Sequence, residues 1–264
     1  MAAMKVHHLN CGTMRVPTSA VVAHVLLIET SNGLALVDSG YGLDDIADPA
    51  RRLGPIRHLI RPALDPAETA ARQVERLGFR RDDVRHIILT HLDHDHTGGL
   101  SDFPHAQVHV TTAEAGGAIR SPSPREKMRY RAAQWAHHPK IIEHDPAGDN
   151  WQGFAAAEQL DKIAPGIVLI SLPGHTRGHA AVAIDTGNGW LLHAGDAFYH
   201  RGTLDGHSRV PAILRAGEAL VAYDLKKVRD NHTRLAELYR HADPALSIIC
   251  SHDPALYENM RTGI

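Results

Sequence analysis

One short stretch of the sequence, residues 90–99, concentrates side chains that can bind a metal ion. Between His91 and His96 there are three histidines and two aspartates, and Gly98 and Gly99 follow, which leave room for a tight backbone path. Buried in a core without partners, such groups would be costly to desolvate. On a loop they can converge on one point, and zinc and similar divalent ions accept imidazole and carboxylate ligands. The stretch therefore predicts a metal site rather than a polar surface turn.

Three more potential ligands stand alone further along the chain. They are His175 in a Pro-Gly-His-Thr-Arg-Gly-His segment, Asp196 in His-Ala-Gly-Asp-Ala and His252 in Cys-Ser-His-Asp. Each follows an apolar run with the character of a strand, and α/β folds place active-site groups in the loops that follow strands. Together with the donors of residues 90–99, these three supply enough ligands for two adjacent metal ions.

The elements that must position these residues are predicted from apolar patterns and turn signals. An Asn-Gly pair between two apolar runs is a strong hairpin signal. Asp65 as N-cap, Pro66 and Glu68 predict a helix start, and a Ser-Pro-Arg-Glu segment predicts another. Strands are predicted at residues 21–29, 34–38, 86–90, 108–110, 167–171, 180–185, 190–194 and 246–251, and helices at 65–78, 124–136 and 224–241.

The order of these elements predicts two similar α/β halves in one domain that spans residues 1–264. A less regular segment at about 115–165 is interpreted as a lid or insert. Within it, residues 120–140 contain six Lys or Arg and one acidic residue. Three interpretations of this basic run are open: a solvated helix face, a lid that attracts an anionic substrate group, and a subunit contact.

Composition excludes several other classes of protein. The chain has 264 residues, 43% of them apolar and 22% charged, as in ordinary globular proteins, which argues against disorder. A net charge of −2 does not favour a nucleic-acid partner, and no apolar run approaches the roughly 18 residues of a membrane span. Residues 1–10 lack the apolar stretch of a secretion signal, so a cytoplasmic location is expected. Cys11 and Cys250 are interpreted as buried, unpaired thiols.

The motif and the three distant ligands together resemble the metallo-β-lactamase-fold hydrolases, whose signature is H-x-H-x-D-H followed by distant His, Asp and His. The match runs from the Leu-Val-Asp-Ser-Gly strand end at residues 36–40 to His252. The resemblance implies a four-layer αββα sandwich with a dinuclear site between its two sheets. By position, His91 and His175 would hold the first metal, Asp95, His96 and His252 the second, and Asp196 would bridge both.

One position departs from the family pattern, because Asp93 stands where the family usually has a second histidine. Asp93 is counted here among the metal ligands, since a carboxylate is a competent ligand. The alternative is that it turns away and leaves the first site weak or empty. Two divalent ions are expected, with zinc first, and a carboxylate raises the prospect of iron or manganese. Supporting rather than ligating roles are expected for His94, His179, His193 and Asp38.

The chemistry that such a site implies is hydrolysis by a hydroxide that bridges the two metals. Asp95 or Asp196 would shuttle the proton to the leaving group. Tyr199 lies three residues after Asp196, the spacing at which the acyl-homoserine-lactone lactonases of this family place a tyrosine that assists the lactone carbonyl. A lactone or another small carboxylic ester is therefore the predicted substrate.

The same residues are also compatible with other functions. They are a thioester hydrolase of the glyoxalase II type, a β-lactamase, and a non-catalytic or diiron metal-binding protein. The expected partner is a small-molecule substrate, with no nucleic acid and no membrane, and a homodimer is left open.

Overall fold

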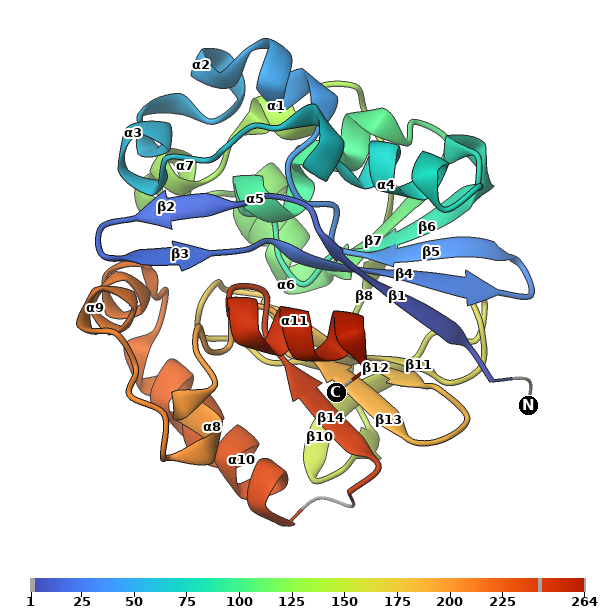
Figure 1. Ribbon diagram of the computed structural model, residues 1–264, viewed down its shortest axis with the longest axis vertical. Helices are drawn as coiled ribbons and strands as arrows, with labels where there is room; N and C mark the ends of the chain where they lie inside the picture. Colours follow the sequence, from blue (N-terminus) through green and yellow to red (C-terminus); the bar gives the residue numbers. More distant parts are fainter. Residues whose placement is uncertain (1–2, 242–243, 264) are drawn as a thin grey trace.

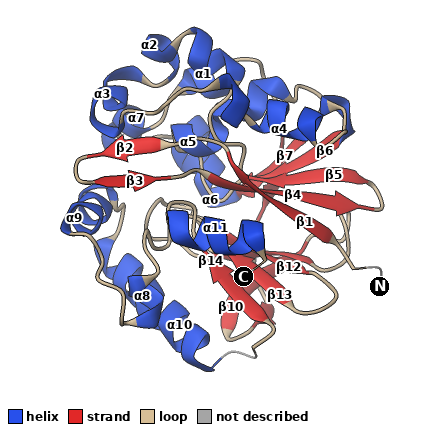
Figure 2. Cartoon of the chain, viewed as in Figure 1, coloured by secondary structure: helices blue, strands red, loops and turns tan. Residues whose placement is uncertain are grey.

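The computed structural model describes residues 3–241 and 244–263, and it contains two six-stranded sheets that pack face to face. Figures 1 and 2 show helices on the outer sides of the two sheets. The first sheet has the order β1-β4-β5-β6-β7-β8 and the second β14-β13-β12-β11-β10-β9. This is the predicted four-layer α/β arrangement.

The strands and helices have these bounds. The first sheet consists of β1 (Lys5–Asn10), β4 (His24–Thr30), β5 (Gly33–Val37), β6 (Val84–Ile88), β7 (Gln107–Thr111) and β8 (Lys140–His144). The second consists of β9 (Asp149–Trp151), β10 (Phe154–Gln159), β11 (Ile167–Ser171), β12 (Ala180–Asp185), β13 (Trp190–His193) and β14 (Leu246–Ile249). A separate hairpin is formed by β2 (Met14–Val16) and β3 (Ser19–Val21). The helices are α1 (Leu43–Ala47), α2 (Pro49–Arg52), α3 (Arg57–Ile60), α4 (Ala70–Arg76), α5 (His94–Thr97), α6 (Thr112–Ala115), α7 (Pro124–Arg129), α8 (Gly202–Asp205), α9 (Ala212–Val221), α10 (Leu225–His241) and α11 (Pro254–Thr262).

Alternation along the central strands explains the layers, because successive side chains of a strand point to opposite faces of its sheet. In β5, Ala35 and Val37 pack between the two sheets, whereas Leu34 and Leu36 pack on the outer core that includes Val74 of α4. The second sheet divides in the same way. Its inner face packs against the inner face of the first sheet, and its outer face packs against α10.

Two predicted helices are interrupted. The first consists of a short 3-10 turn, Pro66–Glu68, after which Thr69 begins α4 as a new N-cap by accepting the Arg72 N–H. The second ends at Arg129 rather than at residue 136, because Tyr130 is extended and its buried hydroxyl donates to Glu114. A tertiary hydrogen bond thus overrides a local helical pattern.

The predicted insert contributes to both sheets. Within residues 115–165, β8 pairs with β7 in parallel, and β10 pairs with β11 in antiparallel register. Cys11 and Cys250 are both buried and unpaired. Among the described residues, no helix is long and apolar enough to cross a membrane.

Candidate metal centre

The loop after β6 is held in place by Asp38, which directly follows β5. Asp38 accepts hydrogen bonds from the Thr90 backbone N–H at 2.8 Å and from the Thr90 hydroxyl at 2.9 Å. It also accepts from Nδ1 of His96 at 2.8 Å, and both of these side chains are buried. Second partners of this kind fix the ring orientation of a ligating histidine. Asp38 therefore directs Nε2 of His96 toward the centre of the site.

The other imidazoles are fixed in the same way. Nδ1 of His91 lies 3.0 Å from the Thr90 hydroxyl, and Nδ1 of His252 donates to the Val22 carbonyl at 2.8 Å. These contacts occupy the Nδ1 atoms and leave the Nε2 atoms facing inward. The two rings come from different sheets, since His91 follows β6 and His252 follows β14.

All seven predicted ligands converge between the ends of the two sheets, in two groups. The first donor set comprises His91, Asp93 and His175, and the second comprises Asp95, His96 and His252; within each set the donor atoms lie within 4.8 Å of one another. Asp196 lies between the sets. Its carboxylate is 3.4 Å from Nε2 of His175 on one side, and 3.4 Å and 3.0 Å from Nε2 of His96 and His252 on the other.

Several of these atoms have no hydrogen-bond partner in the part of the chain that the structure describes. They are Nε2 of His91, Nε2 of His96 and Oδ1 of Asp196, all buried. Leaving a buried polar atom unsatisfied costs about 1–3 kcal/mol. Three such atoms around one point, all of types that ligate divalent ions, fit the binding of metal there.

Electrostatics at the second set also favours an added positive charge. Burial disfavours a charged His96, but the carboxylates of Asp196, Asp38 and Asp95 outweigh burial and raise the pKa of His96 to about 10. Burial also disfavours a charged His252, but the carboxylates of Asp196 and Asp95 outweigh burial and raise the pKa of His252 to about 9. The negative charge here attracts a cation, whether a proton or a divalent metal ion.

The residues expected to support the site make contacts around it. Nε2 of His179 accepts the backbone N–H of Asp196 at 2.9 Å, while its Nδ1 donates to the Leu172 carbonyl. His193 donates to the His24 carbonyl at 2.8 Å. The ring of His94 stacks on Tyr41, and its Nδ1 lies 3.4 Å from Oδ1 of Asp95 without joining either donor set. These three histidines therefore lie outside the ligand groups.

Residues 19–241 match the sequence profile of the Metallo-beta-lactamase superfamily. The chain belongs to this superfamily. A probable metallo-hydrolase of Mycobacterium tuberculosis is 59% identical over 98% of this chain and 83% of its own length. The N-acyl homoserine lactonase AttM of Agrobacterium fabrum is 25% identical over 97% of this chain and 91% of its own.

A solved structure gives the same picture of the fold. An N-acyl homoserine lactone hydrolase with the product N-hexanoyl-L-homoserine at its catalytic metal centre superposes with a TM-score of 0.71. It covers 98% of this chain and 97% of its own, at 23% identity. The chain is thus a metallo-hydrolase of the metallo-β-lactamase fold with lactonase-like neighbours.

Arg129, at the end of α7, is a site residue that the sequence did not predict. Its Nε donates to Oδ1 of Asp93 at 2.6 Å, and its Nη2 lies 2.6 Å from Nε2 of His175. Burial would raise the pKa of Asp93, but Arg129 holds it well below the usual range. The sequence held one hint of this contact: Asp93 is an unusual acid in the motif, and the basic run at residues 120–140 could supply its partner.

Other members of the basic run also turn toward the protein. Arg125 donates to the carbonyls of Leu220 and Ala222 near the end of α9, and Arg120 pairs with Glu143. In the part of the chain that the structure describes, α7 is therefore tied to α9 through arginine side chains rather than being a freely solvated face.

A largely apolar cavity of about 490 Å³ opens onto the two donor sets. Asp93, Asp95, Asp196 and His252 line its inner end, with Tyr199 beside them. Its walls come from the β2–β3 hairpin and from α3, α7 and α9, and the apolar members are Met14, Val16, Pro17, Val21, Ile56, Leu59, Ile60, Met128, Ile213, Leu214, Leu220 and Val221.

Tyr199 lies at the boundary between the ligands and this cavity. Its hydroxyl is 3.5 Å from Nδ1 of His175, and its ring meets the rings of His175 and His252 edge to face. Burial raises the pKa of Tyr199 well above its ordinary value. The hydroxyl therefore keeps its proton and can act as a hydrogen-bond donor.

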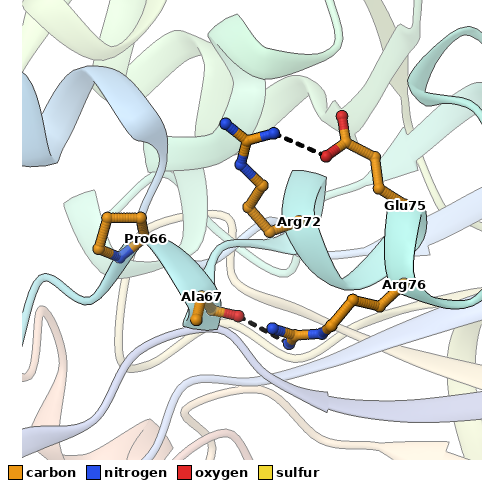
Figure 3. Close-up of a pocket in the computed structure, with 5 residues that line it drawn as sticks. All are labelled: Pro66, Ala67, Arg72, Glu75 and Arg76. Atoms are coloured by element: carbon orange, nitrogen blue, oxygen red, sulfur yellow. Dashed lines mark hydrogen bonds and ion pairs between the residues drawn. The ribbon is translucent and has the colours of Figure 1, made fainter.

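A second hollow, beside α4, does not have these features. Figure 3 shows that its arginines already have partners: Arg72 pairs with Glu75 at 2.8 Å, and Arg76 donates to the Ala67 carbonyl at 2.7 Å. None of its lining residues belongs to a donor set. The candidate site is therefore the cavity at the two donor sets.

Proposed function

We propose that this chain is a metal-dependent hydrolase that opens a lactone or cleaves another small carboxylic ester with an apolar acyl group. The observation that carries the proposal is the junction of a metal-ligand cluster with an apolar cavity of about 490 Å³. Such a cavity accommodates a hydrocarbon chain while a few polar groups at one end orient the reacting bond. The lactonase relatives add support, since one acts on N-acyl homoserine lactones by name.

The two donor sets would hold the metal. His91, Asp93 and His175 would bind the first ion, and Asp95, His96 and His252 the second, with Asp196 between them. Imidazole and carboxylate donors suit zinc, while the carboxylate share also suits iron or manganese. Divalent cations bound there would lower the pKa of water and polarise the ester carbonyl.

Tyr199 would orient the substrate at the mouth of the site. Its hydroxyl faces His175 and borders the cavity, so it can donate a hydrogen bond to the carbonyl oxygen of the ester. That bond strengthens as negative charge develops on the oxygen in the transition state. Tyr199 is therefore proposed as a catalytic residue that raises kcat and contributes little to substrate binding.

Asp95 would transfer the proton from water to the leaving group. Water adds its oxygen to the acyl carbon, the acyl C–O bond breaks, and the departing alkoxide must receive a proton. Both carboxylates line the cavity, but the side chain of Asp95 is 13% exposed, whereas that of Asp196 is 4% exposed and lies between the imidazoles. Asp95 can therefore take a proton from water and return it to the alkoxide.

The test is a comparison of substrate classes on the metal-loaded protein. We expect kcat/KM to be highest for N-acyl homoserine lactones and to rise as the acyl chain lengthens from butanoyl to decanoyl. A thioester of glutathione and a β-lactam should be cleaved at least about tenfold less efficiently. Preference for the thioester or the β-lactam, or no dependence on the acyl chain, would contradict the proposal.

A further inference from the structure

The guanidinium of Arg129 has an acceptor for every one of its N–H groups. Nε donates to Asp93, and Nη2 donates to the other carboxylate oxygen of Asp93 at 2.5 Å and to Nε2 of His175 at 2.6 Å. Nη1 donates to the carbonyls of His175 at 3.0 Å and Val221 at 2.7 Å. A planar fork with five satisfied donors is held in a single geometry.

These acceptors include two of the three donors of the first set. Nε2 of His175 carries one lone pair, which cannot accept a hydrogen bond from Arg129 and ligate a cation at the same time. The same Oδ2 atom of Asp93 that faces Nε2 of His91 at 3.2 Å also accepts from Arg129. Since a guanidinium is always charged, it also repels a divalent ion at that position.

No guanidinium contacts the second donor set in the described part of the chain. Within the described residues, the ion pairs of Asp95 and Asp196 are made only with histidines, and no Lys or Arg lies within pairing distance. The two donor sets therefore differ in what they already hold. The first is neutralised by an arginine, while the second keeps its carboxylates for a cation.

We propose that Arg129 competes with the first metal ion for Asp93 and His175, so that the two donor sets fill in order. The second set binds a cation tightly, and the first binds one only when Arg129 gives up its contacts. This inference rests on the proposed use of both sets for metal. It adds that loading of the first set is coupled to α7 and to the end of α9, which border the apolar cavity.

The test is a metal titration that needs no substrate. Metal-free protein is titrated with Zn²⁺ by calorimetry, and with Co²⁺ while its visible absorption reports the ligand geometry. For the unaltered chain we expect one tight equivalent and a second that binds at least about tenfold more weakly. Arg129→Met keeps an unbranched apolar stem but removes the guanidinium, and with it the charge and the donors. It should tighten the second equivalent at least about tenfold and leave the first nearly unchanged.

A matched control comes from the same helix. Lys127→Met removes a positive charge at an exposed position of α7, so both equivalents should bind as in the unaltered chain. Two equivalents of equal affinity in the unaltered chain would overturn the inference, whether or not Arg129→Met folds. An unchanged second equivalent in folded Arg129→Met would overturn it as well. Failure to bind any metal would overturn both this inference and the proposed function. Ordered metal binding without lactone hydrolysis would contradict the proposed function and leave the inference standing.

Discussion

Nδ1 of His96 lies 2.8 Å from Oδ2 of Asp38, and this buried pair joins the end of β5 to the loop that follows β6. Asp38 has a φ of 59°, in the left-handed region that non-glycine residues seldom adopt. The backbone conformation and the three hydrogen bonds to its carboxylate hold that side chain in one position. Asp38 therefore orients His96 without touching the reacting atoms.

Asp38→Asn keeps the shape of the side chain and removes its charge. We expect metal affinity to fall by about 10–100-fold, the usual cost of losing a carboxylate that orients a ligating histidine. Titration of metal-free protein with zinc measures this. Asp230→Asn, at an exposed i,i+4 pair on α10, is the matched control and should bind zinc as the unaltered chain does. Equal affinities for Asp38→Asn and the control would refute the positioning role.

Asp93→His replaces the partner of Arg129 with the residue type usual in the family pattern. Because a neutral imidazole cannot form the ion pair, Arg129 should release the first donor set. Zinc occupancy measured by elemental analysis should be preserved or should rise toward two ions per chain. A fall in occupancy with the fold intact by circular dichroism would instead indicate a site tuned to a carboxylate.

Tyr199→Phe removes one hydroxyl at the inner end of the cavity. If that hydroxyl stabilises the developing charge on the substrate oxygen, kcat should fall by about 10–100-fold while KM changes less than about threefold. Steady-state kinetics with a lactone give both constants. Tyr239→Phe, at an exposed position on α10, should change neither. An unaltered kcat for Tyr199→Phe would remove this residue from the mechanism.

A row of hydrogen-bonded histidines makes stability depend on pH. Nδ1 of His86 lies 3.0 Å from Nε2 of His109, Nδ1 of His109 lies 2.9 Å from Nε2 of His144, and His144 contacts Glu158. Burial, followed by the neighbouring charges of His144 and His86, lowers the pKa of His109 from 6.5 to about 3. The unfolded chain thus binds a proton below about pH 6.5 that the folded chain does not bind until about pH 3.

Because the unfolded chain takes up this proton first, a fall in pH lowers the free energy of unfolding. The contribution of His109 to stability is complete above about pH 6.5 and is lost as the pH falls toward 3, by up to about 1.4 kcal/mol per pH unit. His109→Gln should be less stable at pH 7 and should show a shallower loss of unfolding free energy between pH 6.5 and 4. Urea unfolding of both proteins across that range checks this, and parallel pH profiles would contradict it.

The convergence of the donor side chains was predictable because ligand-type residues occur where chemistry and spacing coincide. Residues 91–96 contain five ligand-type side chains in six positions, and His175, Asp196 and His252 each follow a buried strand. Strands β11 and β12 also have the predicted bounds, since their apolar runs are flanked by clear turn signals.

The missed features depend on contacts that no local pattern encodes. Arg129 is 36 residues from Asp93 in the sequence, and its role depends on where α7 lies in space. The end of that helix is set by Tyr130, whose hydroxyl reaches buried Glu114. Both features come from the tertiary structure, which brings the basic run onto the metal loop.

The central claim is that hydrolysis depends on metal held by these donors. It is tested most directly by removing the metal with a chelator, assaying N-hexanoyl homoserine lactone, and then restoring zinc. We predict that activity is lost on chelation and returns with zinc in the unaltered chain and in the control His232→Ala, whose histidine pairs with Glu218 outside the donor sets. His96→Ala should remain folded, hold less metal and stay inactive. Full activity in metal-free protein, or in His96→Ala, would contradict the account.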